Sequence, residues 1–308
     1  MFNKILVSLD GSPLSEHALP TALALAQTPG TDIFIARVPT ANGSHEPPTG
    51  RQLEVARREI RQYFDDLRLA QPPTVKLTPL MPEGNVANAI ADIAAAEGID
   101  LIVMSTHGYS GVTRWLLGSV TEKILRTAPC PVLAVRTPAA ADAPKPIRQI
   151  AITLDGSELS ERALAPGLEL AQRLHASVTL LRCVPFVTHN NSLDEVERGL
   201  GRRLQQDAID EAAAYLAARS ASYAQSERVA RSGVEIKTEV RVGPAADNIY
   251  EFVETYGTDL VVMATHGRTG VQRWVYGSVT EKVLHSVKTS LLVVRPVSTK
   301  RYSMRSSE

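Results

Sequence analysis

A glycine pattern that could bind phosphate occurs twice in the chain. A glycine, nine further residues and then Gly-Ser are found at Gly108 with Gly118 and Ser119, and at Gly267 with Gly277 and Ser278. A glycine lets the backbone approach a ligand closely, and Gly-Ser at the start of a helix adds N–H donors, a hydroxyl and the positive end of the helix dipole. The pattern predicts two phosphate-binding loops, although turn formation alone would also explain the glycines.

A second repeated motif supplies a carboxylate. Asp10-Gly11-Ser12 follows an apolar run, and the same three residue types return at Asp155-Gly156-Ser157. Asp-Gly-Ser after a strand is typical of a turn. If the preceding run is a strand, the aspartate carboxylate of the motif also becomes a candidate for hydrogen bonding to a ribose or to an adenine edge.

These motifs belong to a long internal repeat. Asp100 to Arg136 matches Asp259 to Arg295 at 21 of 37 positions without a gap, with an offset of 159. Lys4 to Leu19 returns as Gln149 to Leu164 with an offset of 145, so the second half carries an insertion of 14 residues. One domain type used twice is therefore expected.

Within each half, apolar strand-like runs alternate with helical patterns. Expected strands are Ile5–Leu9, Ile33–Val38, Val75–Leu80, Leu101–Met104 and Val132–Val135, then Ile150–Leu154, Val178–Arg182, Val234–Val240, Leu260–Met263 and Leu291–Val294. Expected helices are Ser15–Gln27 with Ser15 as N-cap, Leu53–Leu69, Val86–Ala96 and Ser119–Arg126, then Ser160–Leu174, Asp194–Ala230, Ala245–Tyr256 and Ser278–Ser286. This alternation predicts a parallel α/β sheet that binds its ligand at the carboxyl ends of the strands.

Composition narrows the function classes. Lys+Arg and Asp+Glu both total 33, so no net field favours nucleic acid or an anionic membrane. No apolar stretch approaches the roughly 20 residues that cross a bilayer, and the first apolar run is too short for a signal peptide. Cys130 and Cys183 occupy non-equivalent positions, which disfavours a structural disulfide. We expect a soluble, cytoplasmic protein of about two domains.

The combined motifs resemble a known family. V-x-L-D-G-S near the start of each half and T-H-G-x-x-G-x(6)-G-S-V-T-E-K near its end are similar to the universal stress protein family, over residues 3–137 and 148–296. The resemblance implies two tandem five-stranded parallel sheets with strand order 3-2-1-4-5, of the adenine-nucleotide α hydrolase type. It also implies ATP as the ligand, with Mg²⁺ as an optional companion. The family's ATP pattern, G-x-x-G-x(9)-G-S/T, departs here at its first glycine, which is Ser105 in one half and Ala264 in the other.

The resemblance assigns a role to each motif position. Asp10 and Asp155 would contact the base or ribose, and Val38 and Val184 would offer backbone groups to adenine. Met104 and Met263 would pack on the base, with core packing as an equal alternative. The phosphates would be held by Gly108, Gly118, Ser119 and Val120 in the first half and by Gly267, Gly277, Ser278 and Val279 in the second.

Other residues near the loops receive simpler interpretations. His107 and His266 have no ligand partner spaced nearby, so turn formation is favoured over catalysis or a metal site. Arg268 could reach a phosphate or remain in solvent. Trp115 and Trp274 favour packing between the halves over ligand stacking.

The last strand of each half predicts how the halves associate. Exposed apolar strand edges are an aggregation hazard, and family members pair their fifth strands between subunits. A tandem chain can pair Val132–Val135 with Leu291–Val294, forming an intramolecular pseudo-dimer that leaves a further homodimer optional. The expected domains are 1–138 and 147–297, with a linker at 139–146 and a flexible tail at 298–308.

The sequence favours an ATP-binding regulatory protein of the stress response. It contains no Walker lysine and no recognisable general base, so slow ATP hydrolysis is the most that we expect. Two alternatives stay open: a structural stress adaptor with degenerate sites, and a nucleotidyl- or phosphotransferase on the same fold.

Overall fold

A computed structural model describes residues 2–41, 47–71, 75–106, 117–136, 145–187, 195–225, 233–265 and 277–295. In the first half the strands are β1 (Lys4–Ser8), β2 (Asp32–Ala36), β3 (Leu77–Leu80), β4 (Leu101–Ser105) and β5 (Val132–Val135). Its helices are α1 (Pro13–Glu16), α2 (Ala18–Leu25), α3 (Arg51–Leu69), α4 (Val86–Ala96) and α5 (Ser119–Thr127).

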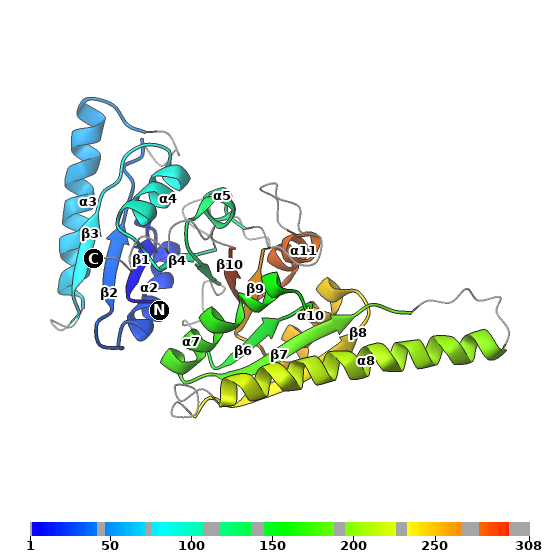
Figure 1. The fold of residues 1–308 in the computed structure, drawn as a ribbon. Helices are drawn as coiled ribbons and strands as arrows, with labels where there is room; N and C mark the ends of the chain where they lie inside the picture. Colours follow the sequence, from blue (N-terminus) through cyan, green and yellow to red (C-terminus); the bar gives the residue numbers. More distant parts are fainter. Residues whose placement is uncertain are drawn as a thin grey trace, which may run out of the picture.

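The second half repeats this order. Its strands are β6 (Gln149–Thr153), β7 (Ser177–Val184), β8 (Ile236–Val242), β9 (Leu260–Ala264) and β10 (Ser290–Val294). Its helices are α6 (Glu158–Glu161), α7 (Leu164–Leu174), α8 (Glu195–Ala224), α10 (Ala245–Tyr256) and α11 (Ser278–Ser286). The insertion in the second half lengthens α8 to 30 residues against 19 in α3, and α8 extends beyond the end of the sheet (Figure 1).

All described strands form one sheet in the order β3-β2-β1-β4-β5-β10-β9-β6-β7-β8. Each half therefore has the expected strand order 3-2-1-4-5, with parallel pairing inside the half. The predicted fold class is confirmed. In both halves the first strand lies between the second and the fourth, where strand order reverses and parallel sheets bind their ligands.

The halves meet through an antiparallel pair between β5 and β10. Leu133 lies opposite Leu292, which is its own equivalent in the repeat because 133 plus 159 is 292. Ala134 lies opposite Leu291, and Val132 lies opposite Val293. Equivalent residues that exchange places across an axis are the mark of a two-fold relation.

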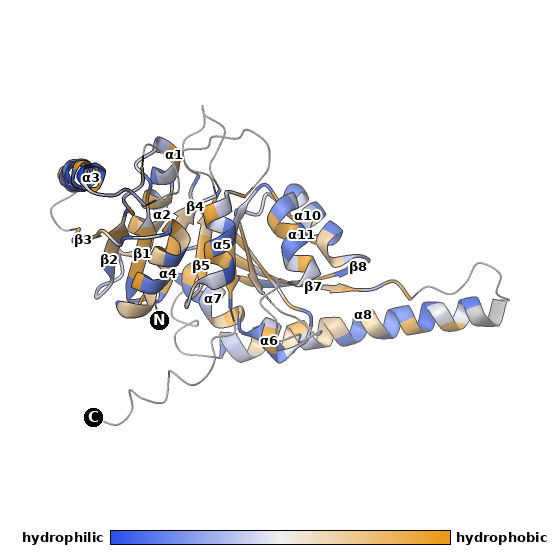
Figure 2. Cartoon of the chain, turned by 90° about the horizontal axis from the view of Figure 1, so that it is seen from above, coloured by the Kyte–Doolittle hydropathy of each residue, from blue (hydrophilic) through white to orange (hydrophobic). Residues whose placement is uncertain are grey.

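Two apolar layers cover the sheet. The residues of β1 alternate between them, with Ile5 and Val7 in one core and Leu6 in the other. The first core receives side chains of α2, α3, α7 and α8, and the second those of α4, α5, α10 and α11. Figure 2 shows the hydrophobic strands between these helical layers.

The helices predicted at the start of each half differ from the structure. The predicted Ser15–Gln27 is split into α1 and α2, and Ser12, not Ser15, is the N-cap, because its side-chain oxygen accepts the N–H of Ser15. Pro20 lies in the first turn of α2 and lacks the N–H that a continuous helix would bond to the preceding turn. The second half is split in the same way into α6 and α7.

None of the described helices combines the length and the apolarity that crossing a bilayer requires.

Candidate functional site

The Asp-Gly-Ser motifs form hydrogen-bonded turns at the ends of β1 and β6. Asp10 Oδ1 accepts the backbone N–H of Ser12 at 2.8 Å, and Gly11 has φ +86°, a left-handed conformation that favours glycine. Ser12 Oγ then accepts the N–H of Ser15 at 3.1 Å and caps α1. The motif therefore forms a turn, as one interpretation of the sequence predicted, and this turn fixes the Asp10 carboxylate at the end of the strand.

The second turn has the same bonds. Asp155 Oδ1 accepts the N–H of Ser157 at 2.9 Å, Gly156 has φ +85°, and Ser157 Oγ accepts the N–H of Ser160 at 3.1 Å. Because the geometry is repeated in two diverged copies, it is a property of the motif.

An arginine that the sequence analysis missed packs on each turn. A Cβ on Gly11 would lie 2.5 Å from Arg37 Cζ, and one on Gly156 would lie 3.0 Å from a terminal nitrogen of Arg182. The guanidinium occupies the space that any side chain at the glycine would need. The signal was present in the sequence, since Arg37 and Arg182 are 145 positions apart, as the two turns are.

Each arginine is held by a tyrosine. Arg37 stacks on the ring of Tyr63, and Arg182 on the ring of Tyr215, with 4.8 Å between the guanidinium carbon and the ring centroid in both. Stacking of this kind is a cation–π contact. Because Tyr63 lies on α3 and Tyr215 on α8, the third helix of each half braces the turn that follows its first strand.

A glutamate completes each cluster. The hydroxyl of Tyr63 donates to Glu16 at 2.8 Å, and that of Tyr215 donates to Glu161 at 2.9 Å. Burial, reinforced by the carboxylate that accepts the proton, raises the pKa of Tyr215 to about 12 and raises that of Tyr63 well above its usual value. Both phenols are therefore neutral donors at physiological pH.

The Gly-Ser motifs stand where α5 and α11 begin. Gly118 and Gly277 are the N-caps, and their N–H groups donate to the carbonyls of Thr106 and Thr265 at 2.9 and 2.8 Å. A Cβ on either glycine would lie 3.3 Å from the same carbonyl. Glycine therefore suits the close approach of two backbone segments at these positions, and the N–H groups of both glycines are already bonded.

The next residues carry the open donors. Neither helix has a side-chain cap, so the N–H groups of the first turn, beginning at Ser119 and Val120, have no helical partner. Ser119 is exposed, as is its equivalent Ser278. The hydroxyl of Thr121 donates to the Ser105 carbonyl at 3.1 Å, and this bond fixes the start of α5 against the end of β4.

The second half has the same arrangement. Ser278 and Val279 open α11, Val279 is 37 % exposed, and the hydroxyl of Thr280 donates to the Ala264 carbonyl at 3.2 Å. The residues that replace the first glycine of the family pattern therefore use their carbonyls to hold the helix start.

The apolar candidates lie at the same edge of the sheet. Ser8 of β1 is in register with Met104 of β4, so Asp10, Val38 and Met104 come from three neighbouring strands. Val38, Met104, Val184 and Met263 are all buried, and Val38, Met104 and Met263 belong to the second core. For the two methionines this favours core packing, the alternative that the sequence left open.

Several predicted residues lie outside the described part of the chain. These are Gly108, Gly267 and Arg268, together with His107, His266, Trp115 and Trp274. In the described part, no group of three or more His, Cys, Asp or Glu residues could hold a metal ion.

A groove of about 910 Å³ adjoins the start of α11. It runs between α10 and α11, and its lining includes three carboxylates, Asp247, Glu251 and Glu281, and one lysine, Lys282. The excess of negative charge disfavours a phosphate inside the groove itself. The open first turn of the helix is the better anion position.

Comparison with known proteins shows what the chain is similar to. Residues 1–136 and 146–295 each match the model of the Universal stress protein family. A universal stress protein of Methanocaldococcus jannaschii is 31% identical over 143 residues, which cover 45% of this chain and 84% of that protein. The universal stress protein YxiE of Bacillus subtilis is 30% identical over 152 residues, covering 44% of this chain and 100% of that protein.

Solved structures resemble the whole chain. A functionally unknown protein from Pseudomonas aeruginosa PAO1 has a TM-score of 0.68 at 17% identity, covering 96% of this chain and 93% of that one. A universal stress protein from Archaeoglobus fulgidus has a TM-score of 0.66 at 16% identity, with coverages of 96% and 99%. At these identities the likeness concerns the fold.

Proposed function

The chain belongs to the universal stress protein family with two tandem domains, and we propose that it is a regulatory protein that binds ATP at the carboxyl edge of each half. The observation that carries this proposal is the twice-built start of a helix, at Ser119 and Ser278, next to an Asp-Gly-Ser turn on the neighbouring strand. Open N–H groups and the helix dipole suit the phosphates. The turn carboxylate suits a ribose or adenine edge.

The proposal assigns roles to the described site residues. Ser119, Val120, Ser278 and Val279 bind phosphate through backbone N–H groups, while Gly118 and Gly277 allow the helix start to approach the preceding loop. Asp10 and Asp155 bind the sugar or base, with Val38 and Val184 alongside. Mg²⁺, where it accompanies ATP, is held by the phosphates, since this chain arranges no described carboxylate cluster for it.

The assembly is part of the same proposal. We take the β5–β10 pair as the interface of an intramolecular pseudo-dimer, which its two-fold register supports. Cys130 and Cys183 are both free, and this agrees with a reducing compartment such as the cytoplasm. The rate of ATP turnover distinguishes a regulatory role from an enzymatic one. A turnover rate above about one per minute would favour an enzyme, because typical enzymes run far faster.

Proline substitution tests the phosphate role without disturbing the fold. Ser119 and Ser278 are the first helical residues, a position where proline is favoured because its missing N–H is unbonded within the helix. The preceding glycines already have φ and ψ near −60° and 142–145°, the conformation that a following proline requires. Ser119→Pro and Ser278→Pro therefore remove one phosphate donor each and leave the helix intact.

Titration calorimetry with ATP and Mg²⁺ measures the effect of each substitution on binding. Each single proline variant should lose about half of the binding stoichiometry, or weaken one of two sites by about tenfold or more, since a charge-assisted bond is worth about 1.5–3 kcal/mol. Ser119→Ala, which keeps the N–H, is the matched control and should lose less. Unchanged binding in both proline variants, with unchanged thermal stability, would refute the phosphate role.

A further inference from the structure

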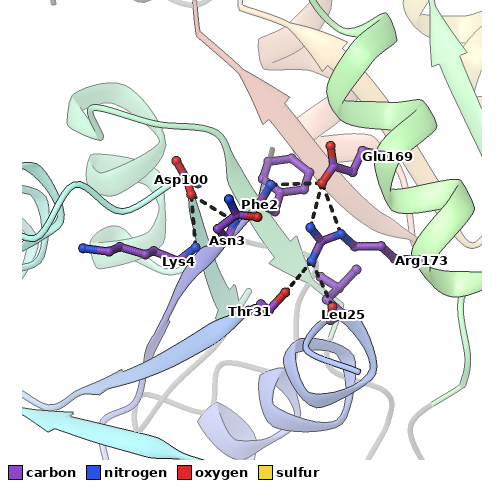
Figure 3. A network of polar contacts seen from close by, with 8 residues as sticks. All are labelled: Phe2, Asn3, Lys4, Leu25, Thr31, Asp100, Glu169 and Arg173. Carbon is purple, nitrogen blue, oxygen red and sulfur yellow. Dashed lines mark hydrogen bonds and ion pairs between the residues drawn. The ribbon is translucent and has the colours of Figure 1, made fainter. Parts of the chain in front are cut away.

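A buried ion pair on α7 reaches from the second half into the first. Glu169 and Arg173 lie one helical turn apart, 2.8 Å from each other, and both side chains are 5 % exposed. Glu169 Oε1 also accepts the N–H of Phe2 at 3.0 Å. The charged pair is thus enclosed where the two halves meet (Figure 3).

Arg173 completes the contact. Its Nη1 donates to the Leu25 carbonyl at 3.1 Å and to Thr31 Oγ1 at 3.0 Å. All three acceptors of the guanidinium, the two first-half groups and Glu169, surround it in Figure 3. A buried charge is tolerated when it is paired and hydrogen-bonded in this way.

The first half leaves these groups available for local reasons. The Leu25 carbonyl ends α2, and its helical donor would be the N–H of residue 29, which is a proline and has none. A cation at a helix C-terminus is favourable. At the N-terminus, the carboxylate of Asp100 takes the N–H groups of Asn3 and Lys4 at 3.0 Å, and Glu169 takes that of Phe2.

The repeat does not reproduce this contact in the other direction. With the offset of 145, Glu169 corresponds to Ala24 and Arg173 to Thr28, so the first half has no such ion pair. Thr31 corresponds to Ala176, which has no hydroxyl. The Leu25 carbonyl corresponds to that of Leu170, which lies inside α7 and is bonded within the helix.

We propose that Glu169 and Arg173 make the second half recognise the first half of this chain in preference to another second half. The two-fold register of β5 and β10 would by itself also suit pairs of like halves, since their edge sequences are similar. Pairing of two second halves would instead bury two ion pairs without the Thr31 hydroxyl or the open Leu25 carbonyl. Pairing of two first halves would leave those groups without a partner. The N–H of Phe2 has an equivalent at Ile147, so it does not distinguish the pairs.

The selectivity follows from counting bonds. Two hydrogen bonds of Arg173, to the Leu25 carbonyl and to Thr31, can form only in the unlike pair. Each such bond is worth roughly a factor of ten in an equilibrium constant. Unlike pairing should therefore be favoured by about a hundredfold. The device is a specificity element of the kind that acts through unsatisfied groups in the wrong pair.

The test begins with the folded full-length chain. A protease site inserted between residues 137 and 145 allows it to be cut after folding, and the products are equilibrated and weighed by native mass spectrometry. The cut protein without further substitutions should yield almost only the unlike pair of a first and a second half. Glu169→Gln with Arg173→Met, which removes both charges at similar volume, should bring the pairs close to the statistical mixture, a loss of selectivity of about a hundredfold.

Two further variants make the result decisive. Glu54→Gln with Arg57→Met removes the ion pairs that Arg57 of α3 makes with Glu54 and Glu83, and should leave the selectivity unchanged. Thr31→Val removes one first-half acceptor, leaves the ion pair intact and should lower the selectivity about tenfold even if the double variant fails to fold. Selectivity of the Thr31→Val protein within about twofold of the parent, or a statistical mixture from the parent itself, would overturn the proposal.

Discussion

Gly11→Ala is expected to destabilise the protein through two separable effects. Gly11 has φ +86°, and a residue with a Cβ pays about 1–2 kcal/mol in this left-handed conformation. The new Cβ would also lie 2.5 Å from Arg37 Cζ, so the guanidinium must leave the ring of Tyr63. Losing a partly exposed cation–π contact adds about 0.5–1 kcal/mol. The total is about 1.5–3 kcal/mol.

Gly30 provides the matched control. It has φ +81° but nothing within 4 Å of the position of a Cβ, so Gly30→Ala should show the backbone cost alone. Thermal unfolding followed by circular dichroism should place the midpoint of Gly11→Ala below that of Gly30→Ala. The difference should be about 2–4 °C for each kcal/mol that the lost cation–π contact adds to the backbone cost. In an Arg37→Ala background this excess should vanish, because the obstructing side chain is absent.

Two outcomes would refute this reasoning. Equal destabilisation by Gly11→Ala and Gly30→Ala would mean that Arg37 moves aside without loss. An excess that persists in the Arg37→Ala background would mean that the turn resists a Cβ for another reason. Gly156→Ala should show a smaller excess than Gly11→Ala, since the nearest atom of Arg182 lies 3.0 Å from the Cβ position.

Two further predictions concern helix packing and thiol reactivity. Gly167→Ala in α7 should destabilise the protein by about 1–3 kcal/mol, because its Cβ would lie 2.7 Å from Ile152 Cδ1. Gly199→Ala in α8, where a Cβ meets open space, should stabilise the protein by about 0.5–1 kcal/mol. Urea unfolding should therefore show changes in the free energy of unfolding of opposite sign for the two variants. Burial raises the pKa of the Cys130 thiol to about 12 and that of Cys183 to about 11, so a disulfide reagent at pH 8 should label both only slowly in the folded protein and Cys130 the more slowly. Rapid labelling of Cys130 before unfolding would contradict its placement in the core.

The sequence alone determined the architecture, because the evidence for it was repeated. Two copies of the same strand, turn and helix-start motifs predicted two domains of one type, and alternating strand and helix patterns predicted a parallel sheet. The order 3-2-1-4-5, which the sheet has, was implied by the resemblance to the universal stress protein family. The Asp10 turn and the Ser119 helix start could also be predicted, because each depends on residues that are adjacent in the chain. The binding roles of these residues and the domain boundaries stay predictions.

Contacts between distant residues were decided only by the tertiary structure. The sequence predicted one helix where Pro20 divides two, and it placed the N-cap at Ser15 instead of Ser12. It also missed Arg37, which follows β2, packs directly on Gly11 after β1, and is held in place by Tyr63 of α3. The repeat marks Arg37 and Arg182 as equivalent residues, but no spacing rule links either arginine to its glycine, because the fold brings them together.

The contact between the halves shows the same limit most clearly. The repeat made pairing of the last strands predictable, since equivalent apolar edges suit a two-fold axis. It could not reveal that Glu169 and Arg173 reach Phe2, Leu25 and Thr31, because this contact exists where the repeat fails. Symmetry of sequence determines what the halves share, whereas the packing of residues that differ decides how one half recognises the other.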